Sequence, residues 1–414
     1  MKVLHIMPYS PYPPIHGGAI RVLYLLKHLA QHHDVSVVCF GEEKDADRLK
    51  SVLNCQLDEV YTVHSPWTRM YRRPGQLYSR FTSMSYLQTA CYSTDMQKKI
   101  DEILAEQDFD LVFSEFCMMG WYQLKTNALK ILDAHNIEHD NYSRMVKLEQ
   151  SLIKKNQYIS ESKKLRCEEI ATFKRQNALF ATSQRDTEII ESLAPGIPKF
   201  VIPNGVDTSY FVPNITSVDP HSMVFTGMMG YTPNSDGMLY FLDEIFPMIT
   251  KEIPDAKITI VGNNPPAVLQ KRASDNVIVT GYVDDVRPYV WNSKAYVVPL
   301  RMGGGTRLKV CEAMSMKKPI ITTSIGCEGI DVESGKHVFI ADTPGKFARM
   351  VINVLQDRSD HARLVENGYK LVRSVYDWSV ICHEMETILQ KLRDDNENCD
   401  QSEVAVSINS FKGG

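Results

Sequence analysis

The chain has 414 residues, which suggests two domains or one large domain at roughly 100–200 residues per domain. Hydrophobic residues make up 43% and charged residues 23%, a mixture typical of a soluble globular protein that can bury a core without disulfides. The formal net charge of -4 argues against a dedicated nucleic-acid binder, because neutralising phosphates requires a basic surface.

The cysteine pattern and the apolar runs bear on the cellular compartment. The nine cysteines are scattered without a C-x-x-C pair, which favours neither a zinc ribbon nor a thioredoxin-like motif and indicates a reduced, cytosolic protein. The opening Met1–Pro8 has too short an apolar run for a signal peptide. No stretch of the sequence approaches the roughly 20 apolar residues that span a bilayer, so we expect a cytoplasmic protein.

In the first half of the chain, short apolar runs alternate with longer amphipathic segments. The predicted strands are Val3–Met7, Val35–Phe40, Leu111–Phe116, Leu129–Asp133 and Ala178–Thr182, and the helical segments include Ile20–Gln31 and Asp95–Glu106. This alternation predicts βαβ units around a parallel sheet. Strands that are apolar on both faces fit a sheet covered by helices on both sides.

The same pattern restarts in the second half. The predicted strands are Met223–Phe225, Ile258–Val261, Val277–Thr280, Ala295–Val298 and Ile320–Thr322, and the predicted helices are Asp236–Thr250, Pro266–Arg272, Val286–Trp291 and Leu308–Met316. Proline, glycine and asparagine are frequent between Ala194 and Asp207, which predicts turns and loops between the two sets of strands. We therefore place one domain at residues 1–199 and a second at 200–375.

Beyond the second domain, a helix is expected over residues 376–393, and the polar segment 394–414 is expected to be disordered. Two further segments, 64–92 and 144–175, combine basic residues with aromatic residues or glutamates. Either segment is compatible with a surface that faces anionic lipid or with an ordinary solvated face.

A paired-glycine turn is the first candidate site. Gly17 and Gly18 follow the first predicted strand and precede a helix, so the backbone can approach an anion that the helix N-terminus attracts. The turn lacks the G-x-G-x-x-G pattern of nicotinamide binding, and a plain βα turn remains an alternative.

The second candidate is the polar run Asp133–Glu138, which contains His135 and begins at the carboxyl end of a predicted strand. Ligands of open α/β sheets gather at that edge, although a single histidine is more often structural. By contrast, the D-x-D triplets Asp45–Asp47 and Asp108–Asp110 lie in a charged helical stretch and just before a strand, so no metal site is expected.

The most informative segment is a glycine-rich loop that leads into a helix. Gly303, Gly304 and Gly305 follow a strand, and Thr306 is positioned to cap the next helix. Glycines and a helix N-terminus can hold a diphosphate that nearby cations neutralise. Those cations would be Arg301, Arg307 and Lys309. Glu312, roughly 9 Å further along the helix, could accept hydrogen bonds from two adjacent sugar hydroxyls.

From Met1 to about Arg393, the chain resembles family 4 of the retaining glycosyltransferases, which have the GT-B fold. The most specific parts are Ile202–Asp207 and the block from Gly303 to Gly329, with Glu312-Ala313-Met314, Lys318 to Thr323 and Gly326-Cys327-Glu328-Gly329. The resemblance implies two Rossmann-like domains whose parallel sheets face each other across a cleft. It also implies that the helix from Tyr376 packs back on the first domain.

The resemblance assigns roles to particular residues. It implies that Gly17 and Gly18 close over the donor diphosphate and that His135 contacts the transferred sugar. Val283, within Gly281-Tyr282-Val283, would offer backbone groups to the nucleobase, and Glu312 would hold the ribose.

The chain departs from the family at two places. Gly304 stands where the family commonly has a sugar-binding glutamate, and residues 227–234 lack the usual arginine and lysine. Backbone groups from Gly303 to Thr306, together with Arg301, Arg307 and Lys309, are expected to compensate. A branch of the family shares the G-G-G-T-R-L-K pattern.

We therefore expect a hexosyltransferase-like enzyme that moves a sugar from a nucleotide diphosphate sugar to a glycan or lipid-linked acceptor with retention. His135, Arg307 and Lys309 would be catalytic, and no metal or other cofactor is expected. A peripheral contact with the inner membrane surface is possible in this scheme, and nucleic acid is not an expected partner. The alternatives are a nucleotide-sugar epimerase and a non-catalytic scaffold that binds nucleotide-sugar.

Overall fold

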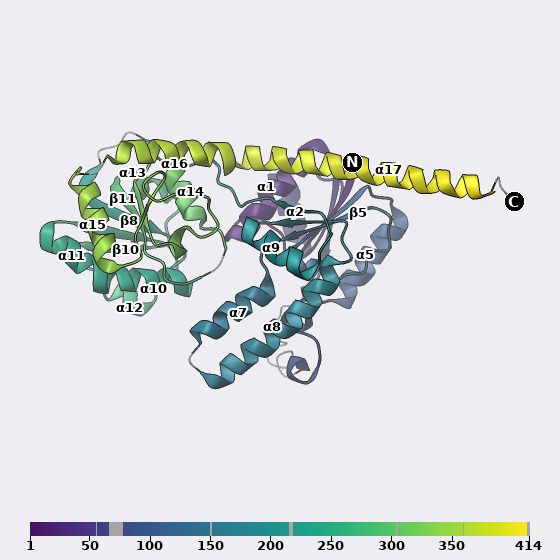
Figure 1. Ribbon diagram of the computed structural model, residues 1–414, viewed down its shortest axis with the longest axis horizontal. Helices are drawn as coiled ribbons and strands as arrows, with labels where there is room; N and C mark the ends of the chain where they lie inside the picture. The colour runs from purple at the N-terminus through teal and green to yellow at the C-terminus, as the bar shows by residue number, and fades with distance from the viewer. Residues whose placement is uncertain are drawn as a thin grey trace. The chain divides into compact units, whose positions relative to one another are not determined.

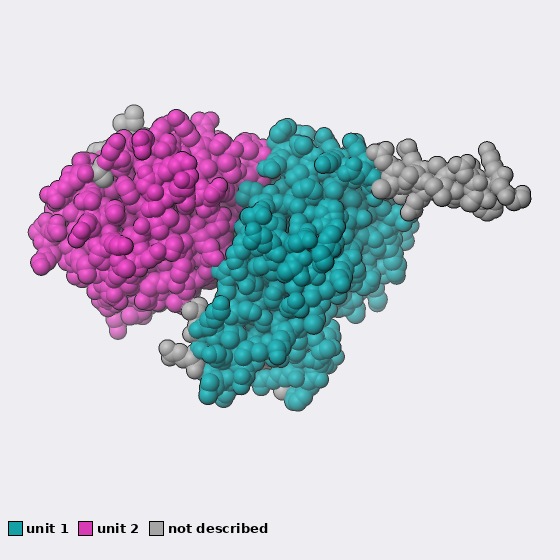
Figure 2. Space-filling model, viewed as in Figure 1, with its two compact units in different colours: residues 1–203, 382–414 teal, residues 204–381 magenta. Residues whose placement is uncertain are grey.

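The computed structural model describes the chain except residues 55, 66–77, 150, 215–217, 304, 359 and 412–414, and it leaves the side chains of 148 and 397–411 undescribed. The chain divides into two compact units, which we treat separately. Unit 1 comprises Met1–Pro203 and Cys382–Gly414, and unit 2 comprises Asn204–Ile381 (Figure 2). No helix in the described part of the chain is both long and apolar enough to cross a lipid bilayer.

Unit 1 is built on a seven-stranded parallel sheet with the order β3-β2-β1-β4-β5-β6-β7. Figure 1 labels β5 of this sheet and several helices of the same unit. The strands are β1 (Lys2–Met7), β2 (Asp34–Phe40), β3 (Val60–Val63), β4 (Leu111–Glu115), β5 (Leu129–Ala134), β6 (Ala178–Ala181) and β7 (Lys199–Val201). The described helices are α1 (Gly17–His32), α2 (Glu43–Val52), α4 (Tyr86–Cys91), α5 (Thr94–Glu106), α6 (Phe116–Met119), α7 (Glu138–Leu148), α8 (Leu152–Phe173) and α9 (Gln184–Leu193). Strands β4 and β6 are buried at every position, as expected for a sheet covered on both faces.

Unit 2 has a six-stranded parallel sheet with the order β10-β9-β8-β11-β12-β13. The strands are β8 (Asp219–Thr226), β9 (Lys257–Val261), β10 (Val277–Gly281), β11 (Ser293–Val298), β12 (Ile320–Thr322) and β13 (Phe339–Ile340). The helices are α10 (Thr232–Tyr240), η2 (Phe241–Ile245), α11 (Phe246–Glu252), α12 (Ala267–Gln270), α13 (Arg287–Trp291), α14 (Leu308–Ser315), η3 (Ile325–Cys327), α15 (Pro344–Leu355) and α16 (His361–Val375). The two parallel sheets confirm the predicted α/β architecture.

The order of the strands fixes where a ligand site can form. In unit 1 the chain moves outward from β1 to β3 and then resumes on the other side of β1 with β4. In unit 2 it moves from β8 to β10 and resumes beside β8 with β11. Each reversal leaves a crevice at the carboxyl ends of the two central strands, where ligands of open α/β sheets bind.

The last helix, α17 (Trp378–Phe411), begins in unit 2 and continues into unit 1. The Asp377 carboxylate accepts the Ser379 backbone N–H at its start, at 2.8 Å. The sequence predicted that the helix ends near Arg393 and that residues 394–414 are disordered, whereas the helix continues to Phe411. No proline or glycine occurs between Asp394 and Lys412, so a polar composition alone did not indicate a helix end.

The predicted helix Asp236–Thr250 also differs from the structure. It starts earlier, as α10, and passes through the π-helical turn η2 before α11 begins. Pro247 lies in the first turn of α11, and proline lacks the N–H that an uninterrupted helix would require there. The wider turn η2 therefore ends at Ile245, and α11 begins with Phe246, one residue before the proline.

Candidate functional site

At the carboxyl ends of β1, β4 and β5, unit 1 buries a network of charged and polar side chains. The Glu115 carboxylate lies 2.8 Å from His5 Nε2 and 2.6 Å from His135 Nε2. Asp133 lies 3.4 Å from His135 and receives two hydrogen bonds from the Arg21 guanidinium, at 2.6 and 2.9 Å. The backbone brings these groups together because β4 and β5 are adjacent parallel strands whose ends coincide.

The network keeps Glu115 ionised. Burial of this carboxyl group opposes ionisation, but the hydrogen bonds from His135 and His5 lower the pKa of Glu115 well below its usual range. A charged Glu115 in turn orients the His135 ring through Nε2. The predicted site residue His135 is therefore a fixed side chain that is buried to 6% exposure rather than a mobile surface histidine.

The paired-glycine turn lies against the same network. His16 caps α1 by accepting the Ala19 N–H at Nδ1, at 3.2 Å, and its pKa is lowered by burial and by the neighbouring His135. Gly18 has no room for a side chain, because a Cβ would lie 2.8 Å from Phe116. Phe116, with a φ of 64°, stacks on His135 at a centroid distance of 3.7 Å. The predicted elements Gly17–Gly18 and His135 thus belong to one local site.

The three groups Glu115, Asp133 and His135 have the chemistry of a metal site, since their potential ligand atoms lie within 4.8 Å of one another. However, both oxygens of Asp133 already accept hydrogen bonds from Arg21, and those of Glu115 from the two histidines. The guanidinium provides the positive charge that a metal would otherwise supply. The arrangement fits a hydrogen-bonded framework for His135 better than it fits a cation site.

In unit 2, the glycine-rich loop follows β11 at the strand reversal. Gly303 and Gly305 have φ values of 114° and 79°, conformations that residues with side chains rarely adopt. The predicted site residue Gly304 lies outside the described residues. The expected cap at Thr306 is wrong, because Arg307 has the non-helical ψ of 75° and occupies the N-cap position of α14. The helix itself starts at Leu308, as predicted.

Lys309, on α14, is the cation that side chains of β8 and α10 position together. Its ammonium lies 2.8 Å from Asn234 Oδ1 and 4.0 Å from the centre of the Phe225 ring. A Cβ added to Gly227 would lie 2.6 Å from Nζ, so the absence of a side chain there leaves the space for Lys309. Lys309 therefore lies next to the segment that in the resembling family carries arginine and lysine.

The surroundings of Lys309 shift its protonation. Burial lowers the pKa of Lys309 to about 7, while Glu312 opposes this shift and Arg307 adds to it. Burial also raises the pKa of Glu312 to about 7, against the influence of Lys309. An anionic ligand beside Lys309 would favour its charged form.

The structure brings together only part of the predicted cation cluster. Arg307 is buried to 6% exposure, and its Nε lies 3.3 Å from the Ile325 carbonyl. Arg301 instead pairs with Asp236 at 2.7 Å and stacks on Tyr240. Val283, the predicted nucleobase contact, packs partly buried on the core of unit 2 behind the exposed Tyr282.

Several residues of the site had no signal that we recognised in the sequence. Glu115 is the last residue of β4, although the predicted strand extended to Phe116, and Arg21 lies within a predicted helix, where a charged residue is ordinarily solvent-exposed. A carboxylate at the last position of an otherwise apolar strand was the signal that could have identified Glu115. Asn234, the partner of Lys309, lies in the segment 227–234, where the sequence showed only that the usual arginine and lysine are missing.

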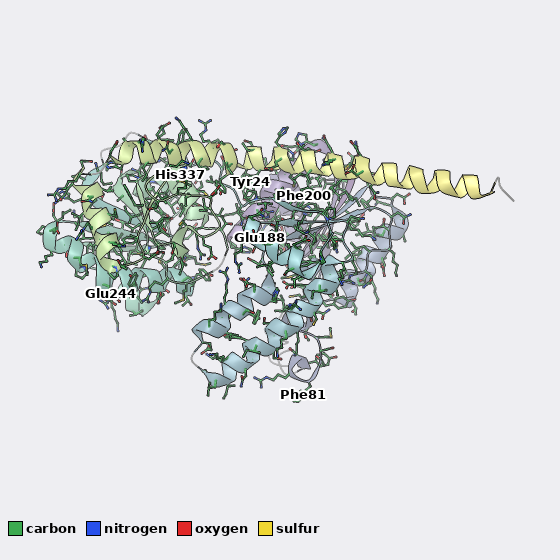
Figure 3. The ribbon with its side chains drawn as sticks, viewed as in Figure 1. Tyr24, Phe81, Glu188, Phe200, Glu244 and His337 are labelled. Atoms are coloured by element: carbon green, nitrogen blue, oxygen red, sulfur yellow. The ribbon has the colours of Figure 1, made fainter. Side chains whose placement is uncertain are left out.

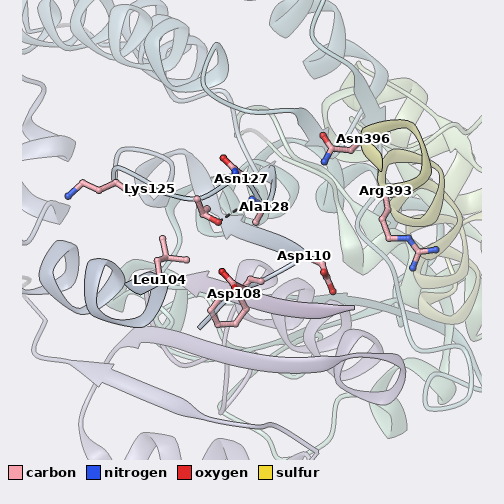
Figure 4. A pocket seen from close by; sticks show the side chains of 10 residues that line it. Leu104, Asp108, Asp110, Lys125, Asn127, Ala128, Arg393 and Asn396 are labelled. Atoms are coloured by element: carbon pink, nitrogen blue, oxygen red, sulfur yellow. Dashed lines mark hydrogen bonds between the residues drawn. The ribbon is translucent and has the colours of Figure 1, made fainter. Parts of the chain in front are cut away.

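A separate cavity of about 470 Å³ lies at the opposite, amino-terminal edge of the unit 1 sheet (Figure 4). Asp108, Asp110, Lys125 and Arg393 are among its lining residues. Asp110 accepts the Lys2 backbone N–H at 2.7 Å, so this D-x-D carboxylate ties the start of β1 to β4.

Comparison with known proteins places this chain in a family. The model for family 4 glycosyltransferases matches residues 15–210, and the model for glycosyl transferases group 1 matches residues 220–357. The chain therefore belongs to the group 1 and family 4 glycosyltransferases, and it is a glycosyltransferase.

A sequence relative and two solved structures resemble the chain over most of its length. The relative is described as an uncharacterized 44.6 kDa protein in the cps region of Klebsiella pneumoniae; it is 25% identical over 91% of this chain and 96% of its own. Sucrose-phosphate synthase from Thermosynechococcus elongatus has a TM-score of 0.67 at 14% identity, covering 95% of this chain and 99% of that one. Anabaena HepE in complex with UDP has a TM-score of 0.65 at 14% identity, covering 94% and 100%. These structures, together with the two parallel sheets, confirm the GT-B fold.

Proposed function

We propose that this glycosyltransferase moves a sugar from a nucleotide diphosphate sugar to a glycan or lipid-linked acceptor, with retention and without a metal. The observation that carries the proposal is the Lys309 ammonium held by Asn234 beside Gly227, at the strand reversal of unit 2. The complexes of HepE with UDP and with UDP-glucose support a uridine nucleotide as the first donor to try. The relative in a cps region supports a role in polysaccharide synthesis.

In this scheme the developing charge on the leaving diphosphate is stabilised by Lys309, Arg307 and the N–H groups of the glycine-rich loop. Glycosyl transfer passes through an oxocarbenium-like state, and groups placed where charge develops accelerate it most. Glu312 would accept hydrogen bonds from the ribose. His135, oriented by Glu115, would contact the transferred sugar, and the acceptor would attack on the face from which the diphosphate leaves.

The proposed location is the cytoplasm. The seven cysteines whose side chains the structure describes are all free, which supports a reducing compartment. Arg301 remains a proposed contact for the donor, although binding there would require it to exchange its pairing with Asp236.

The test is to incubate the purified protein with UDP-glucose and other nucleotide sugars and a glycan acceptor, and to measure nucleoside diphosphate release and acceptor mass. Lys309→Ala is expected to lower turnover by about 100-fold or more, because removing one charge-stabilising group typically costs that much. Lys317→Ala, a partly exposed lysine paired with Glu366, is the matched control and is expected to keep full activity.

Three outcomes would contradict parts of the proposal. An isomerised donor without nucleoside diphosphate release would indicate an epimerase. Stabilisation by UDP in a thermal-shift assay without turnover of any donor would indicate a binding scaffold. Activity that is abolished by EDTA and restored by a divalent cation would contradict the metal-independent mechanism.

A further inference from the structure

The outer end of the α7–α8 hairpin in unit 1 exposes aliphatic side chains. Leu152 and Ile153 begin α8 and are 76% and 77% exposed, and Met145 on α7 is also exposed. The hairpin extends away from the sheet, as an antiparallel pair that forms a lobe of unit 1 (Figures 1 and 2). Contact between water and two adjacent aliphatic side chains is unfavourable. A partner that covered Leu152 and Ile153 would remove this cost.

The charges of α8 are segregated by sign. Its three glutamates accept hydrogen bonds from within unit 1: Glu161 from Ser79 and Tyr86, Glu168 from Ser85, and Glu169 from His139 and Glu138. Lys154, Lys163 and Arg166 are instead exposed. The three acidic groups therefore face the protein, and three of the five basic side chains of the helix face solvent, while Lys164 contacts Ser79.

Aliphatic and basic side chains share one face of α8. Leu152, Ile159, Lys163 and Arg166 follow at intervals of seven, four and three residues, which places them along one side of a helix. Near the hairpin end, Lys147 is exposed as well, and the nearby Glu149 accepts the Ser151 N–H at 2.9 Å. Phe81, 83% exposed, ends the helical turn 78–81, whose Ser79 donates to Glu161 of α8, and Figure 3 places it away from Phe200 of the sheet.

We propose that this end of the hairpin, formed by Leu152, Ile153, Lys154 and the exposed face of α8, docks on an anionic lipid bilayer. Aliphatic side chains would enter the boundary between headgroups and acyl chains while the basic side chains contact lipid phosphates. A second copy of the chain fits less well, because it would bring two basic faces together. A narrow protruding end also offers little of the roughly 800 Å² per partner that a stable protein interface buries.

The docking surface is independent of the proposed sugar transfer, since its test measures binding to lipid rather than activity. The full chain is sedimented with vesicles of phosphatidylcholine alone and with vesicles of phosphatidylcholine and phosphatidylglycerol in equal proportion. The chain is expected to bind the anionic vesicles only. Leu152→Ser/Ile153→Ser and Lys154→Glu/Lys155→Glu are each expected to weaken this binding by about tenfold or more.

The matched control is Met248→Ser/Val268→Ser, which removes exposed aliphatic side chains, 45% and 51% exposed, from unit 2. It is expected to bind as the unchanged protein does, and circular dichroism establishes that each variant is folded. Equal binding to both kinds of vesicle, an equal loss in the control, or no vesicle binding by the unchanged protein overturns the proposal. A dimer in sedimentation equilibrium that dissociates on Leu152→Ser/Ile153→Ser, without vesicle binding, would assign the surface to a second copy.

Discussion

Arg21 is fully buried, and its guanidinium is committed to fixed partners. It donates two hydrogen bonds to Asp133 and one to the Pro203 carbonyl, at 2.9 Å. A buried ion pair adds little net stability when complete, but removing one partner leaves an uncompensated buried charge. Arg21 thus holds the Asp133 carboxylate in place beside His135 and also binds Pro203, the last residue of the first segment of unit 1.

Arg21→Ala is expected to lower the free energy of unfolding by about 3–5 kcal/mol, because Asp133 would lose its buried counter-charge. Urea denaturation followed by circular dichroism measures the change. Arg185→Ala is the control: Arg185 is 45% exposed and pairs with Asp140, so its loss should cost at most about 1 kcal/mol. Similar losses for the two variants would show that the Arg21–Asp133 pair is not a structural support.

The lowered pKa of Lys309 leads to a prediction of how donor binding depends on pH. Since its pKa is lowered to about 7, its ammonium is mostly charged at roughly pH 6 and mostly neutral at roughly pH 8. Glu312, with its pKa raised to about 7, gains a negative charge over the same interval. Both changes disfavour an anion as the pH rises.

The Kd for UDP, measured by calorimetric titration, should therefore rise by about tenfold between roughly pH 6 and pH 8. Lys309→Ala should bind UDP more weakly at every pH and with a flatter pH dependence. Since the ionisation of the nucleotide itself is common to both proteins, the difference between the two slopes reports on the site. Parallel slopes would place the diphosphate elsewhere.

The site residues that belong to a local sequence motif could be predicted from the sequence. His135, the Gly17–Gly18 turn and the segment from Gly303 to Glu312 stand where a strand ends, so the strand prediction located them. The framework around His135 could not be predicted in this way, because His5 and Glu115 are 110 residues apart and Arg21 and Asp133 are 112 apart. Only the register of adjacent strands brings such groups together.

At the scale of the elements, α8 positions a loop as well as an exposed face. The Glu161 carboxylate accepts the Ser79 hydroxyl at 2.7 Å and the Tyr86 N–H at 2.6 Å, and the Lys164 ammonium contacts the Ser79 carbonyl. Glu168 likewise accepts the Ser85 hydroxyl and N–H. The loop before α4 is therefore attached to one side of α8 by carboxylates rather than by an apolar core.

Glu161→Gln should loosen this attachment, because the amide nitrogen of glutamine would face one of the two donors. The loss of a hydrogen bond to a charged, buried acceptor costs about 1.5–3 kcal/mol. We expect faster amide exchange over residues 78–91, measured by hydrogen–deuterium exchange, with little change in the sheet. Glu102→Gln, at an exposed pair with Lys99, is the control. Unchanged exchange over residues 78–91 would contradict the role assigned to Glu161.

The elements also show which patterns were sufficient for fold prediction. The central strands β4 and β11 contain short apolar runs, and their predicted bounds lie within two residues of those observed. The strands β3, β7 and β13 have four residues or fewer, so no apolar run of sufficient length marked them. The extent of α17 was missed because polar helices lack the apolar periodicity by which helices were identified.

At the scale of the whole molecule, the junction motif Ile202–Asp207 and the start of α17 are held together by the backbone. The Val206 N–H donates to the Tyr376 carbonyl at 2.8 Å, and the Trp378 N–H donates to the Val206 carbonyl at 3.2 Å. Because α17 then continues into unit 1, the chain passes between the two units at two adjacent places, before Asn204 and after Ile381. Gly205 of the motif lies where these two chain segments pack together, and the packing requires a glycine there.

A Cβ on Gly205 would lie 2.7 Å from Ile381, 2.9 Å from Trp378 and 2.9 Å from the Tyr376 carbonyl. Two of these contacts involve packed side chains and the third is backbone, so none can move freely. Gly205→Ala is therefore expected to destabilise unit 2 by about 1–3 kcal/mol, the usual cost of overpacking. Gly345→Ala provides the control, because nothing lies within 4 Å of its added Cβ and alanine favours the helix it occupies. Differential scanning calorimetry should show a lower unfolding temperature for Gly205→Ala and an unchanged or higher one for Gly345→Ala. Equal effects of the two substitutions would mean that the junction accommodates a side chain, and that the glycine in this motif is not required by the packing of α17.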